Sequence, residues 1–402
     1  MKPALSFRRA REDDLDRLVE IHANAFPDPR SFDARARNFM ANRFGALDEL
    51  RVVEQRGVIV AHAFLFAFEI GFGGERVHSA GIASVGVAPE ARGTGVAGAL
   101  LEHLHTEANA RGDAIAVLFP FRQGFYARHG YAPATATRRL VLSPHAVPRA
   151  WRADAVRAAV GEDRAAITDA YDRGLRRHTG WLGRDARAWE ALIVDERTRW
   201  LVAARADGTV AGYVAWSLDQ SEAHAMTTML VRELIADDEP TRRALLGAIG
   251  AQRDQVHEVA MDVEADDPID VAFVDADRMR FGSDSAEHVL GEILGGPMVR
   301  LVDVGRALGA RGYSVDGELR FVVDGVTDAL GLRVKDGRGQ LGASASAPTV
   351  HLAPDTLAAV LYGALRPSDA ARLGLLQTDA PHTLGVADRV LALPPYFALD
   401  PF

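Results

Sequence analysis

The stretch that decides the fold is residues 82–101, IASVGVAPEARGTGVAGALL. Its first part is rich in apolar and small residues, which predicts a buried strand, and Pro89 marks the end of that strand. A glycine-containing turn follows, and beyond it apolar residues recur every four positions, as on the buried side of a helix. These helix residues are Val96, Leu100, Leu104 and Ala108, and Gly112 supplies a C-terminal stop. The segment therefore predicts a strand, a tight loop and a helix in succession.

The loop of this segment, residues 92–97 (RGTGVA), has the chemistry of an anion site. The first turn of a helix exposes backbone N–H groups without internal partners, and the helix dipole favours negative charge there. Gly93 and Gly95 let the backbone approach a pyrophosphate closely. The pattern is neither G-x-G-x-x-G nor a P-loop with its lysine, which disfavours a dinucleotide or a nucleoside triphosphate. The alternative interpretation is an ordinary glycine turn before a core helix.

The whole segment resembles the acyl-CoA signature of the GNAT superfamily of N-acyltransferases. The resemblance implies that the strand splays from its neighbour, that the pantetheine arm lies in the gap and that the pyrophosphate lies on the loop. It implies acetyl-CoA as the acyl donor. The residues implied to bind this donor are Val85, Gly86, Val87, Arg92, Gly93, Thr94, Gly95, Val96, Ala97, Gly98, Phe121 and Arg122.

A second segment, residues 118–131 (LFPFRQGFYARHGY), points to one family within this superfamily. It places Tyr126 on a short helix after a buried strand. Together with the length of 402 residues, a three-part organisation and the final Phe402, it resembles the Eis (enhanced intracellular survival) acetyltransferases. That resemblance implies a mixed α+β (α/β) architecture: tandem GNAT folds, one active and one degenerate, followed by a sterol-carrier-protein-like α/β domain. It also implies a homohexamer.

Changes of pattern along the chain predict three domains, at residues 1–145, 150–290 and 291–402. The segment at 143–154 (SPHAVPRAWRAD) has two prolines and few periodic apolar positions, as expected of a linker. In the second domain, residues 234–240 (LIADDEP) stand where the anion loop stands in the first. Three carboxylates there replace the arginine and glycines and would repel a pyrophosphate. The sequence therefore predicts one CoA site per chain.

Hydrophobic periodicity also predicts the individual elements. Helices are expected over residues 12–25, 31–44, 124–129, 162–176, 185–193, 241–255 and 355–365. Strands are expected over residues 5–7, 51–55, 58–68, 77–87, 114–119, 138–142, 200–204, 210–216, 225–231, 256–263, 319–323 and 332–334. The Asp336-Gly337 pair predicts a hairpin turn.

Formation of an amide from a thioester needs a neutral amine, a polarised carbonyl and a protonated sulfur leaving group. The backbone N–H of Val87 is the candidate that polarises the carbonyl. Tyr126 is the candidate general acid, because a phenol is protonated at neutral pH and can pass a proton to the departing sulfur. The alternative for Tyr126 is a buried structural tyrosine. The resemblance to the Eis family favours the acid.

The same resemblance implies that the general base is the C-terminal carboxylate, which here belongs to Phe402 in the ending YFALDPF. A frayed tail is the alternative. Tyr396, Phe397 and Phe402 would expose a large apolar area to water, which favours a docked tail. Asp400 is expected to add negative charge for an ammonium substrate.

Several other polar and aromatic residues are weaker candidates. His103 and His105 lie two positions apart on a helix and do not share a face, and no HExxH-type spacing predicts a metal site. His129 is interpreted as a turn histidine. A solvated helix face is expected to hold Glu102, Glu107 and Arg111, whereas the core, or else an acceptor cavity, holds Phe26, Phe32 and Phe39.

The composition excludes several classes of protein. The 46 basic and 55 acidic residues give a formal charge of −9, which argues against a nucleic-acid binder and allows cationic substrates. The chain has no cysteine, so disulfides, thiolate metal sites and a cysteine nucleophile are excluded. No apolar run reaches the ~20 residues of a membrane-spanning helix, and residues 1–16 lack a signal-peptide core. We therefore expect a cytoplasmic protein without a membrane partner.

Together these features predict an acetyl-CoA-dependent N-acetyltransferase in which the amine attacks the thioester directly in a ternary complex. The expected acceptors are primary amines of polycationic small molecules, such as aminoglycosides or lysine-like and polyamine-like compounds. The alternative is a non-catalytic acyl-CoA sensor or a lipid-binding scaffold. Compared with better-known members of the family, the small Ser84 and the aromatic Phe119 are expected to reshape the acceptor pocket.

Overall fold

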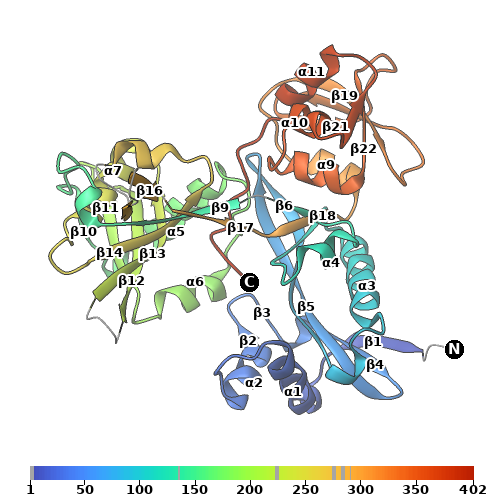
Figure 1. Ribbon diagram of the computed structural model, residues 1–402, viewed down its shortest axis with the longest axis horizontal. Coiled ribbons are helices and arrows are strands. Elements are labelled where there is room, and N and C mark those ends of the chain that lie inside the picture. The colour runs from blue at the N-terminus through green and yellow to red at the C-terminus, as the bar shows by residue number, and fades with distance from the viewer. Residues whose placement is uncertain (1–3, 135, 222–225, 274–277, 282–285, 290) are drawn as a thin grey trace.

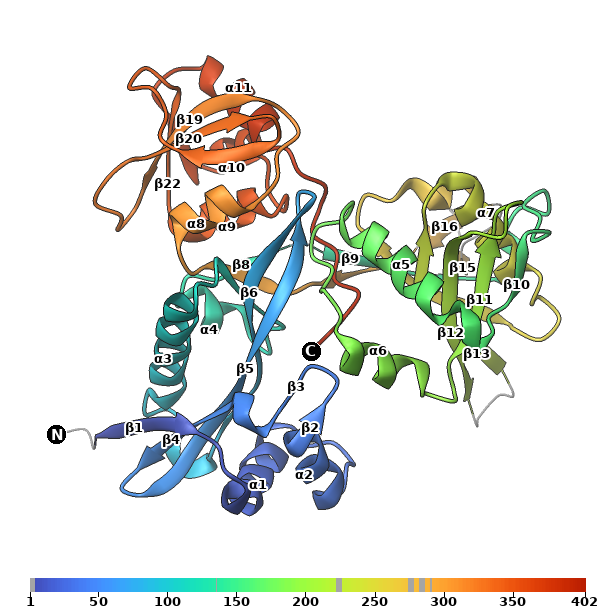
Figure 2. The same ribbon diagram turned by 180° about the vertical axis from the view of Figure 1, so that it is seen from behind.

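The computed structural model describes residues 4–134, 136–221, 226–273, 278–281, 286–289 and 291–402. The chain forms three lobes, and the C-terminal segment ends between the first and the second of them (Figures 1 and 2). The first two lobes are each built on a seven-stranded sheet, and the third is built on a five-stranded sheet. Mixed sheets covered by helices in all three lobes confirm the predicted α+β architecture.

The first sheet has the strand order β1-β4-β5-β6-β7-β18-β8. Its strands are β1 (Leu5–Arg9), β4 (Leu50–Gln55), β5 (Val58–Phe72), β6 (Glu75–Val87), β7 (Ile115–Leu118), β8 (Ala132–Pro133) and β18 (Met298–Leu301). The helices packed around it are α1 (Leu15–Ala25), α2 (Phe32–Met40), α3 (Val96–Arg111) and α4 (Gln123–Ala127). The strand, loop and helix predicted from residues 82–112 are present as the end of β6, the following loop and α3.

Strand β5 explains why residues 58–68 are continuously apolar. Successive side chains of a strand point to opposite faces of the sheet. Phe64 and Phe66 pack into the same cluster as α1 and α2, whereas Ala63 and Leu65 pack into the cluster of α3. The strand is therefore buried on both faces, and it runs four residues beyond the predicted end, to Phe72.

The second sheet has the order β10-β11-β12-β13-β14-β9-β17. Its strands are β9 (Ala136–Leu142), β10 (Val156–Ala158), β11 (Arg199–Ala204), β12 (Val210–Ser221), β13 (Met226–Ala236), β14 (Glu258–Glu264) and β17 (Glu292–Gly295). Its helices are α5 (Arg164–Leu175), α6 (Ala186–Ile193) and α7 (Glu239–Gly250). A central parallel pair, β13 with β14, matches the parallel pair β6 with β7 of the first sheet. The two lobes therefore repeat one topology.

The third sheet has the order β21-β20-β19-β22-β23. Its strands are β19 (Gly317–Val323), β20 (Leu330–Lys335), β21 (Arg338–Leu341), β22 (Thr349–Leu352) and β23 (Leu376–Thr378). Its helices are α8 (Val304–Ala310), α9 (Pro354–Leu361), α10 (Pro367–Arg372) and α11 (His382–Val390). Two antiparallel strand pairs lie outside these three sheets. They are β2 (Ala41–Asn42) with β3 (Gly45–Ala46), and β15 (Arg278–Phe281) with β16 (Ala286–Val289).

Two strands cross between the first and second lobes. Strand β9 leaves the first lobe and pairs with β14 and β17 of the second sheet. Strand β18 returns from the second lobe and inserts between β7 and β8 of the first sheet. The limits 1–145, 150–290 and 291–402 stay a prediction, and pairing across them ties the lobes together.

The helix expected over residues 31–44 ends at Met40. Ser31 caps its start by accepting a hydrogen bond from the backbone N–H of Ala34. After Met40, the side chain of Asn42 accepts from the backbone N–H groups of Phe44 and Gly45 at 2.8 and 3.1 Å. This turn joins β2 to β3 and replaces the last predicted helical turn, because an asparagine side chain competes with the backbone for such bonds.

No helix among the described residues is both long enough and apolar enough to cross a membrane.

Candidate active site

The two central strands of the first sheet separate at the predicted place. Strands β6 and β7 pair in parallel from Ser79 with Ile115 to Gly81 with Val117. Strand β6 then continues without β7 as far as Val87. A gap opens between the strands beyond Gly81, and it leads to the loop that carries Arg92.

A β-bulge interrupts β6 beside this gap. The register against β5 shifts between the Phe64–Ala83 pair and the His62–Gly86 pair, and Ser84 has a φ of 50°. A left-handed φ is strained for a residue other than glycine. A Cβ on Gly86 would lie 2.6 Å from Nε2 of His62. Gly86 is therefore required by the close approach of the His62 ring.

His62 itself is completely buried, and burial lowers its pKa to about 3. Its ring stacks on His22 at 6.0 Å and meets the edge of Phe39 at 5.3 Å. The neutral ring is a packing element beneath the bulge.

A cavity of about 680 Å³ lies along the gap and the loop. Apart from Gly86 and Thr94, it is lined by all the predicted donor-binding residues. Its other lining residues, which the sequence interpretation missed, are Asn24, Ala25, Phe26, Ala91, Phe125 and Arg128. Of these, Arg128 follows Tyr126 by two positions, so its position next to the catalytic candidate was the available signal.

The loop before α3 is shaped by its glycines. Gly93 and Gly95 have φ values of +75° and +92°, and open space surrounds the position of a Cβ on either residue. Glycine is therefore needed for the backbone conformation and not for lack of room. Gly95 is the N-cap of α3, and no side chain caps this end of the helix. The first N–H groups of α3 are left for a ligand.

The Arg92 side chain lines the cavity and is bound to two backbone carbonyls. Its Nε donates to the carbonyl of Val87 at 3.2 Å, and its Nη2 donates to the carbonyl of Asn24 at 2.9 Å. It ties the end of β6 to α1 and so holds the mouth of the cavity. Arg122 and Arg128, which line the same cavity, supply further positive charge.

Tyr126 lies on α4 and is only 3% exposed. Its ring meets the edges or faces of Phe121, Phe125 and Tyr131 at centroid distances of 5.6, 5.0 and 5.9 Å. Within the described part of the chain, its hydroxyl has no hydrogen-bond partner. Burial raises the pKa of Tyr126 to about 12, so the phenol is protonated at neutral pH.

The end of the chain docks against the first lobe. The ring of Phe402 packs on Phe44, Phe68 and Phe119 at centroid distances of 6.0, 4.9 and 5.4 Å. Together with Ser84, Phe402 lines a second cavity of about 410 Å³. The bulge therefore separates two cavities, because Ser84 lines this one and Val85 lines the donor cavity.

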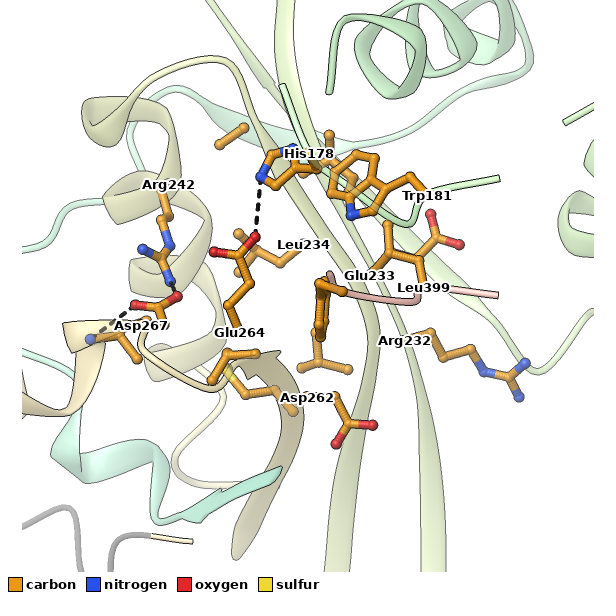
Figure 3. A pocket seen from close by; sticks show the side chains of 17 residues that line it. His178, Trp181, Arg232, Glu233, Leu234, Arg242, Asp262, Glu264, Asp267 and Leu399 are labelled. Carbon is orange, nitrogen blue, oxygen red and sulfur yellow. Dashed lines mark hydrogen bonds and ion pairs between the residues drawn. The ribbon is translucent and has the colours of Figure 1, made fainter. Parts of the chain in front are cut away.

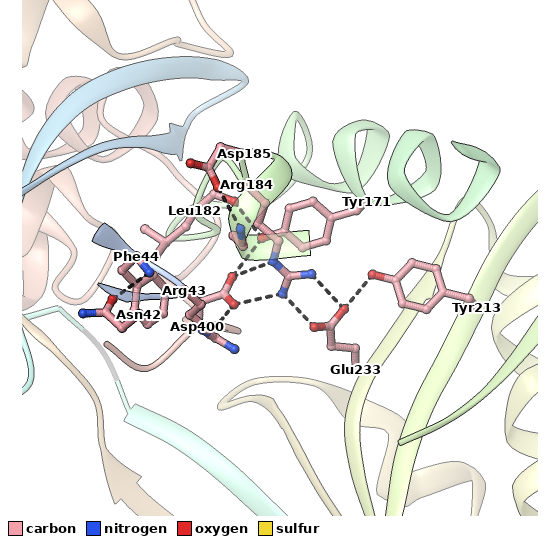
Figure 4. Close-up of polar contacts among 11 residues, drawn as sticks. Asn42, Arg43, Phe44, Tyr171, Leu182, Arg184, Asp185, Tyr213, Glu233 and Asp400 are labelled. Atoms are coloured by element: carbon pink, nitrogen blue, oxygen red, sulfur yellow. Dashed lines mark hydrogen bonds and ion pairs between the residues drawn. The ribbon is translucent and has the colours of Figure 1, made fainter. Parts of the chain in front are cut away.

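A buried ionic network fixes this tail (Figure 4). Asp400 accepts from Nε and Nη2 of Arg184, both at 3.0 Å, and from Nη2 of Arg43 at 2.6 Å. Arg184 also donates to both carboxylate oxygens of Glu233, at 2.7 and 3.1 Å. The side chains of Arg184 and Asp400 are each 2% exposed. The hydroxyl of Tyr171 donates to Asp400 at 3.2 Å.

The network corrects the expectation for Asp400. Its negative charge is neutralised by Arg184 and Arg43, so it does not attract an ammonium substrate. Instead it joins three parts of the chain, because Arg43 comes from the first lobe and Arg184 from the second.

Comparison with known proteins shows what the three lobes are similar to. The family model described as an acetyltransferase (GNAT) domain matches residues 6–134, a second model with that description matches residues 180–301, and a sterol carrier protein domain matches residues 304–398. N-acetyltransferase Eis of Mycobacterium tuberculosis is 25% identical over an alignment of 337 residues that covers 78% of this chain and 78% of the relative. The chain is a GNAT acetyltransferase that is similar to the Eis proteins. It is an acyltransferase.

Solved structures share this fold along the full length. A GCN5-related N-acetyltransferase from Anabaena variabilis has a TM-score of 0.84 at 20% identity and covers 99% of this chain and 100% of its own. One from Kribbella flavida has a TM-score of 0.81 at 25% identity, with coverage of 100% and 99%. Eis1 from Mycobacterium abscessus has a TM-score of 0.77 at 20% identity, with coverage of 99% and 100%. GNAT acetyltransferases use acetyl-CoA as co-substrate.

The second GNAT lobe of this Eis-like chain keeps the separation of the two central strands but not the loop. Strands β13 and β14 pair only as far as Val231 with Met261, and β13 continues to Ala236. At the start of α7, however, Asp238 caps the helix by accepting from the N–H of Thr241 at 2.9 Å. A carboxylate of the chain thus occupies the helix end that is open in α3, and the single CoA site stays a prediction.

A cavity of about 170 Å³ lies where β13 and β14 separate (Figure 3). His178 stacks on Trp181 at 4.2 Å, and its Nε2 lies 3.8 Å from the carboxylate of Glu264. Burial raises the pKa of Glu264 to about 7. Phe397 and Leu399 of the C-terminal segment line the cavity. The tail therefore packs against the gap between β13 and β14 before it reaches the first lobe.

The structure corrects the interpretation of the α3 surface. Glu107 accepts from Nε of Arg51 at 2.8 Å, and the Arg51 side chain is 4% exposed. Arg111 donates to Asp113 and to the carbonyl of Phe66, both at 2.9 Å. Glu107, whose side chain is 31% exposed, and Arg111 therefore tie α3 to the sheet, whereas Glu102 is exposed as expected.

The structure also shows where the weaker histidine and phenylalanine candidates lie. Nε2 of His105 is 2.8 Å from the hydroxyl of Tyr131, whereas the His103 ring stacks on Phe7 at 4.4 Å. His129 lies in the turn after α4, where its backbone N–H donates to the carbonyl of Tyr126. Of the three phenylalanines considered, Phe26 lines the donor cavity, Phe39 is core and Phe32 is 49% exposed.

Proposed function

We propose that this Eis-like protein transfers the acetyl group of acetyl-CoA to a primary amine at the bulge of β6. The observation that carries the proposal is the meeting of two cavities at adjacent residues, Ser84 and Val85. A donor in the larger cavity and an amine in the smaller one would approach each other there. Holding two reactants together in this way lowers the entropic barrier of the reaction.

The donor cavity has the features that the CoA portion needs. The uncapped start of α3 and the glycines before it suit a pyrophosphate, and Arg122 and Arg128 complement its charge. The apolar side chains of Val85, Val87 and Phe125 suit the pantetheine arm. The proposed set is the one implied by the sequence, with Arg92 assigned to positioning the loop.

The register of β6 supports the role proposed for the Val87 N–H. In an antiparallel ladder, hydrogen-bonded pairs alternate with non-bonded pairs. Ala88 donates to the carbonyl of Val60, so the neighbouring pair of Val87 with Ala61 is of the non-bonded kind. The N–H of Val87 consequently points away from β5 and toward the gap. It is available to polarise the thioester carbonyl.

Tyr126 and Phe402 are the proposed acid and base. The terminal carboxylate of Phe402 would accept a proton from the amine as its nitrogen bonds to the carbonyl carbon. The carbon–sulfur bond then breaks, and the phenol of Tyr126 would donate its proton to the sulfur. Burial, which keeps the phenol protonated, and the docked ring of Phe402 support these assignments.

The acceptor class, assembly and location remain proposals as well. The sequence predicts polycationic acceptors such as aminoglycosides, a homohexamer, and a cytoplasmic protein. These expectations define the first experiment, in which acetyl-CoA is incubated with a panel of primary amines and thiol release is measured. Turnover with at least one amine is expected. Binding of acetyl-CoA without turnover on any amine would favour the acyl-CoA sensor or scaffold instead.

A further inference from the structure

The cavity between β13 and β14 holds two hydrogen-bond acceptors that face each other. Nδ1 of His178 lies 2.9 Å from the carbonyl oxygen of Gly174, which can only accept, so the neutral ring carries its proton on Nδ1. Burial lowers the pKa of His178, so the ring is neutral at pH 7 and its Nε2 has a free lone pair. That Nε2 lies 3.8 Å from the carboxylate of Glu264 (Figure 3). When Glu264 is ionised, the pair therefore needs a proton donor.

Glu264 is also the carboxylate of this cavity without an arginine partner. The other three that line it, Glu233, Asp262 and Asp267, each form an ion pair with an arginine. Among the described residues, no arginine or lysine forms an ion pair with Glu264. Burial raises the pKa of Glu264 to about 7, and the charge of Asp266 adds to that rise. A bound cation would stabilise the ionised carboxylate.

A buried donor lines the same cavity. The indole of Trp181 is 3% exposed, and its Nε1–H has no hydrogen-bond partner among the described residues. The ring stacks on His178 and Tyr171 at centroid distances of 4.2 and 5.3 Å, which leaves its edge free. In Figure 3 the nitrogen on that edge points toward the middle of the lining side chains. Because an unsatisfied buried donor is unfavourable, an acceptor on a ligand would be stabilised here.

The rest of the wall is mainly apolar, and the volume is small. Val231, Met261, Ile269, Phe397 and Leu399 line the cavity, which measures about 170 Å³. An apolar protein cavity of about 150 Å³ holds a molecule of the size of benzene. The cavity therefore suits a short hydrocarbon chain, in a ligand of about four to eight non-hydrogen atoms.

We propose that the second lobe binds a small amino alcohol in this cavity, at a site separate from the acetyl-transfer site. The ammonium group donates to Nε2 of His178 and to the carboxylate of Glu264, since its several donors can bridge two acceptors 3.8 Å apart. The hydroxyl oxygen accepts from Nε1–H of Trp181. One positive charge is sufficient, because the other carboxylates are already paired. This binding does not rest on the acetyl transfer proposed above.

The test follows the indole N–H signals of the full-length protein by NMR, without acetyl-CoA and at pH 8, above the pKa of Glu264. The probes are 2-aminoethanol, 1-propylamine, in which a methyl group replaces the hydroxyl, and ethylene glycol, in which a hydroxyl replaces the ammonium. We expect 2-aminoethanol to shift the Trp181 signal, assigned with Trp181→Phe, until the site is saturated. Its Kd should be at least about tenfold lower than that of either analogue. No saturable shift, or equal affinity for an analogue, would overturn the inference.

Two variants test the role of the unpaired carboxylate. Glu264→Gln keeps the shape of the side chain and removes its charge, so the Kd of 2-aminoethanol should rise at least about tenfold. Asp262→Asn is the matched control, because this carboxylate lines the same cavity but is paired with Arg139, and it should leave the Kd unchanged. An unchanged Kd in Glu264→Gln would contradict the proposed site. The comparison of the three probes needs no variant, so it decides the question even where a variant does not fold.

The outcomes also separate this site from the proposed function. Saturable binding of 2-aminoethanol at Trp181, without turnover of any amine, would leave this site standing and overturn acetyl transfer. Turnover of amines without a shift of the Trp181 signal would do the reverse.

Discussion

At the scale of single residues, Tyr126 is the most direct test of the chemistry. Tyr126→Phe keeps the ring among Phe121, Phe125 and Tyr131 and removes only the hydroxyl. We expect kcat to fall by about 10²-fold or more, which is the usual contribution of a general acid, with little change in the KM for acetyl-CoA. Because burial raises the pKa of the phenol to about 12, the kcat of the unaltered protein should show no loss from tyrosine ionisation near pH 10.

Tyr131→Phe is the matched control, since Tyr131 is also buried and its hydroxyl pairs with His105. Its kcat should stay close to that of the unaltered protein. An unchanged kcat in Tyr126→Phe would remove the acid role.

At the scale of elements, the bulge of β6 depends on the missing side chain of Gly86. Gly86→Ala would bring a Cβ to within 2.6 Å of the His62 ring, which is enclosed by Phe39 and His22. We expect the free energy of unfolding, measured with denaturant, to fall by about 1–3 kcal/mol. Combining Gly86→Ala with His62→Ala should recover part of that loss compared with the sum of the two single changes. Strict additivity would contradict the proposed contact.

Glu264 on strand β14 of the second lobe should make the stability of the fold depend on pH. The pKa of Glu264 is about 7, above its ordinary value of 4.5, so the folded chain binds this proton more tightly than the unfolded chain. The stabilising contribution of that proton is present below pH 4.5 and is lost as the pH rises to about 7. Glu264→Gln should therefore raise the unfolding free energy at pH 8 by about 1–3 kcal/mol and have little effect at pH 4. Glu239→Gln, an exposed carboxylate in α7, should show no such difference between the two pH values.

At the scale of the whole molecule, the Arg43–Asp400–Arg184 network sets the position of the tail. Asp400→Asn keeps the shape of the side chain but removes the charge that holds both arginines. Loosening the tail should displace the carboxylate of Phe402, so we expect kcat to fall at least about tenfold while the KM for acetyl-CoA is kept. Asp262→Asn removes a half-exposed ion pair with Arg139 and serves as the control. Equal kcat values for Asp400→Asn and the control would show that the network is only structural.

Part of this architecture can be predicted from the sequence. The strand, loop and helix around Arg92 follow from apolar spacing and from glycines that require left-handed φ values, and both of these signals are local. The tandem organisation followed from family resemblance and is confirmed by the family models. The short helix of Tyr126 is present as predicted. The ion pair of Glu107 on α3 is not predictable in this way, because its partner Arg51 lies on a strand far away in the sequence.

The sequence by itself determined the acyl-CoA fold of the first lobe, because a helix face, a glycine turn and a buried strand are each encoded by neighbouring residues. Only the tertiary structure decided which residues line the cavity beside the bulge and which partners Asp400 has. Arg43, Arg184 and Asp400 lie far apart along the chain, and their charges cancel only when the lobes bring them together. The spacing of residues along a chain does not predict which distant charged side chains form ion pairs. The polarity of a site made from several lobes therefore has to be read from the folded molecule.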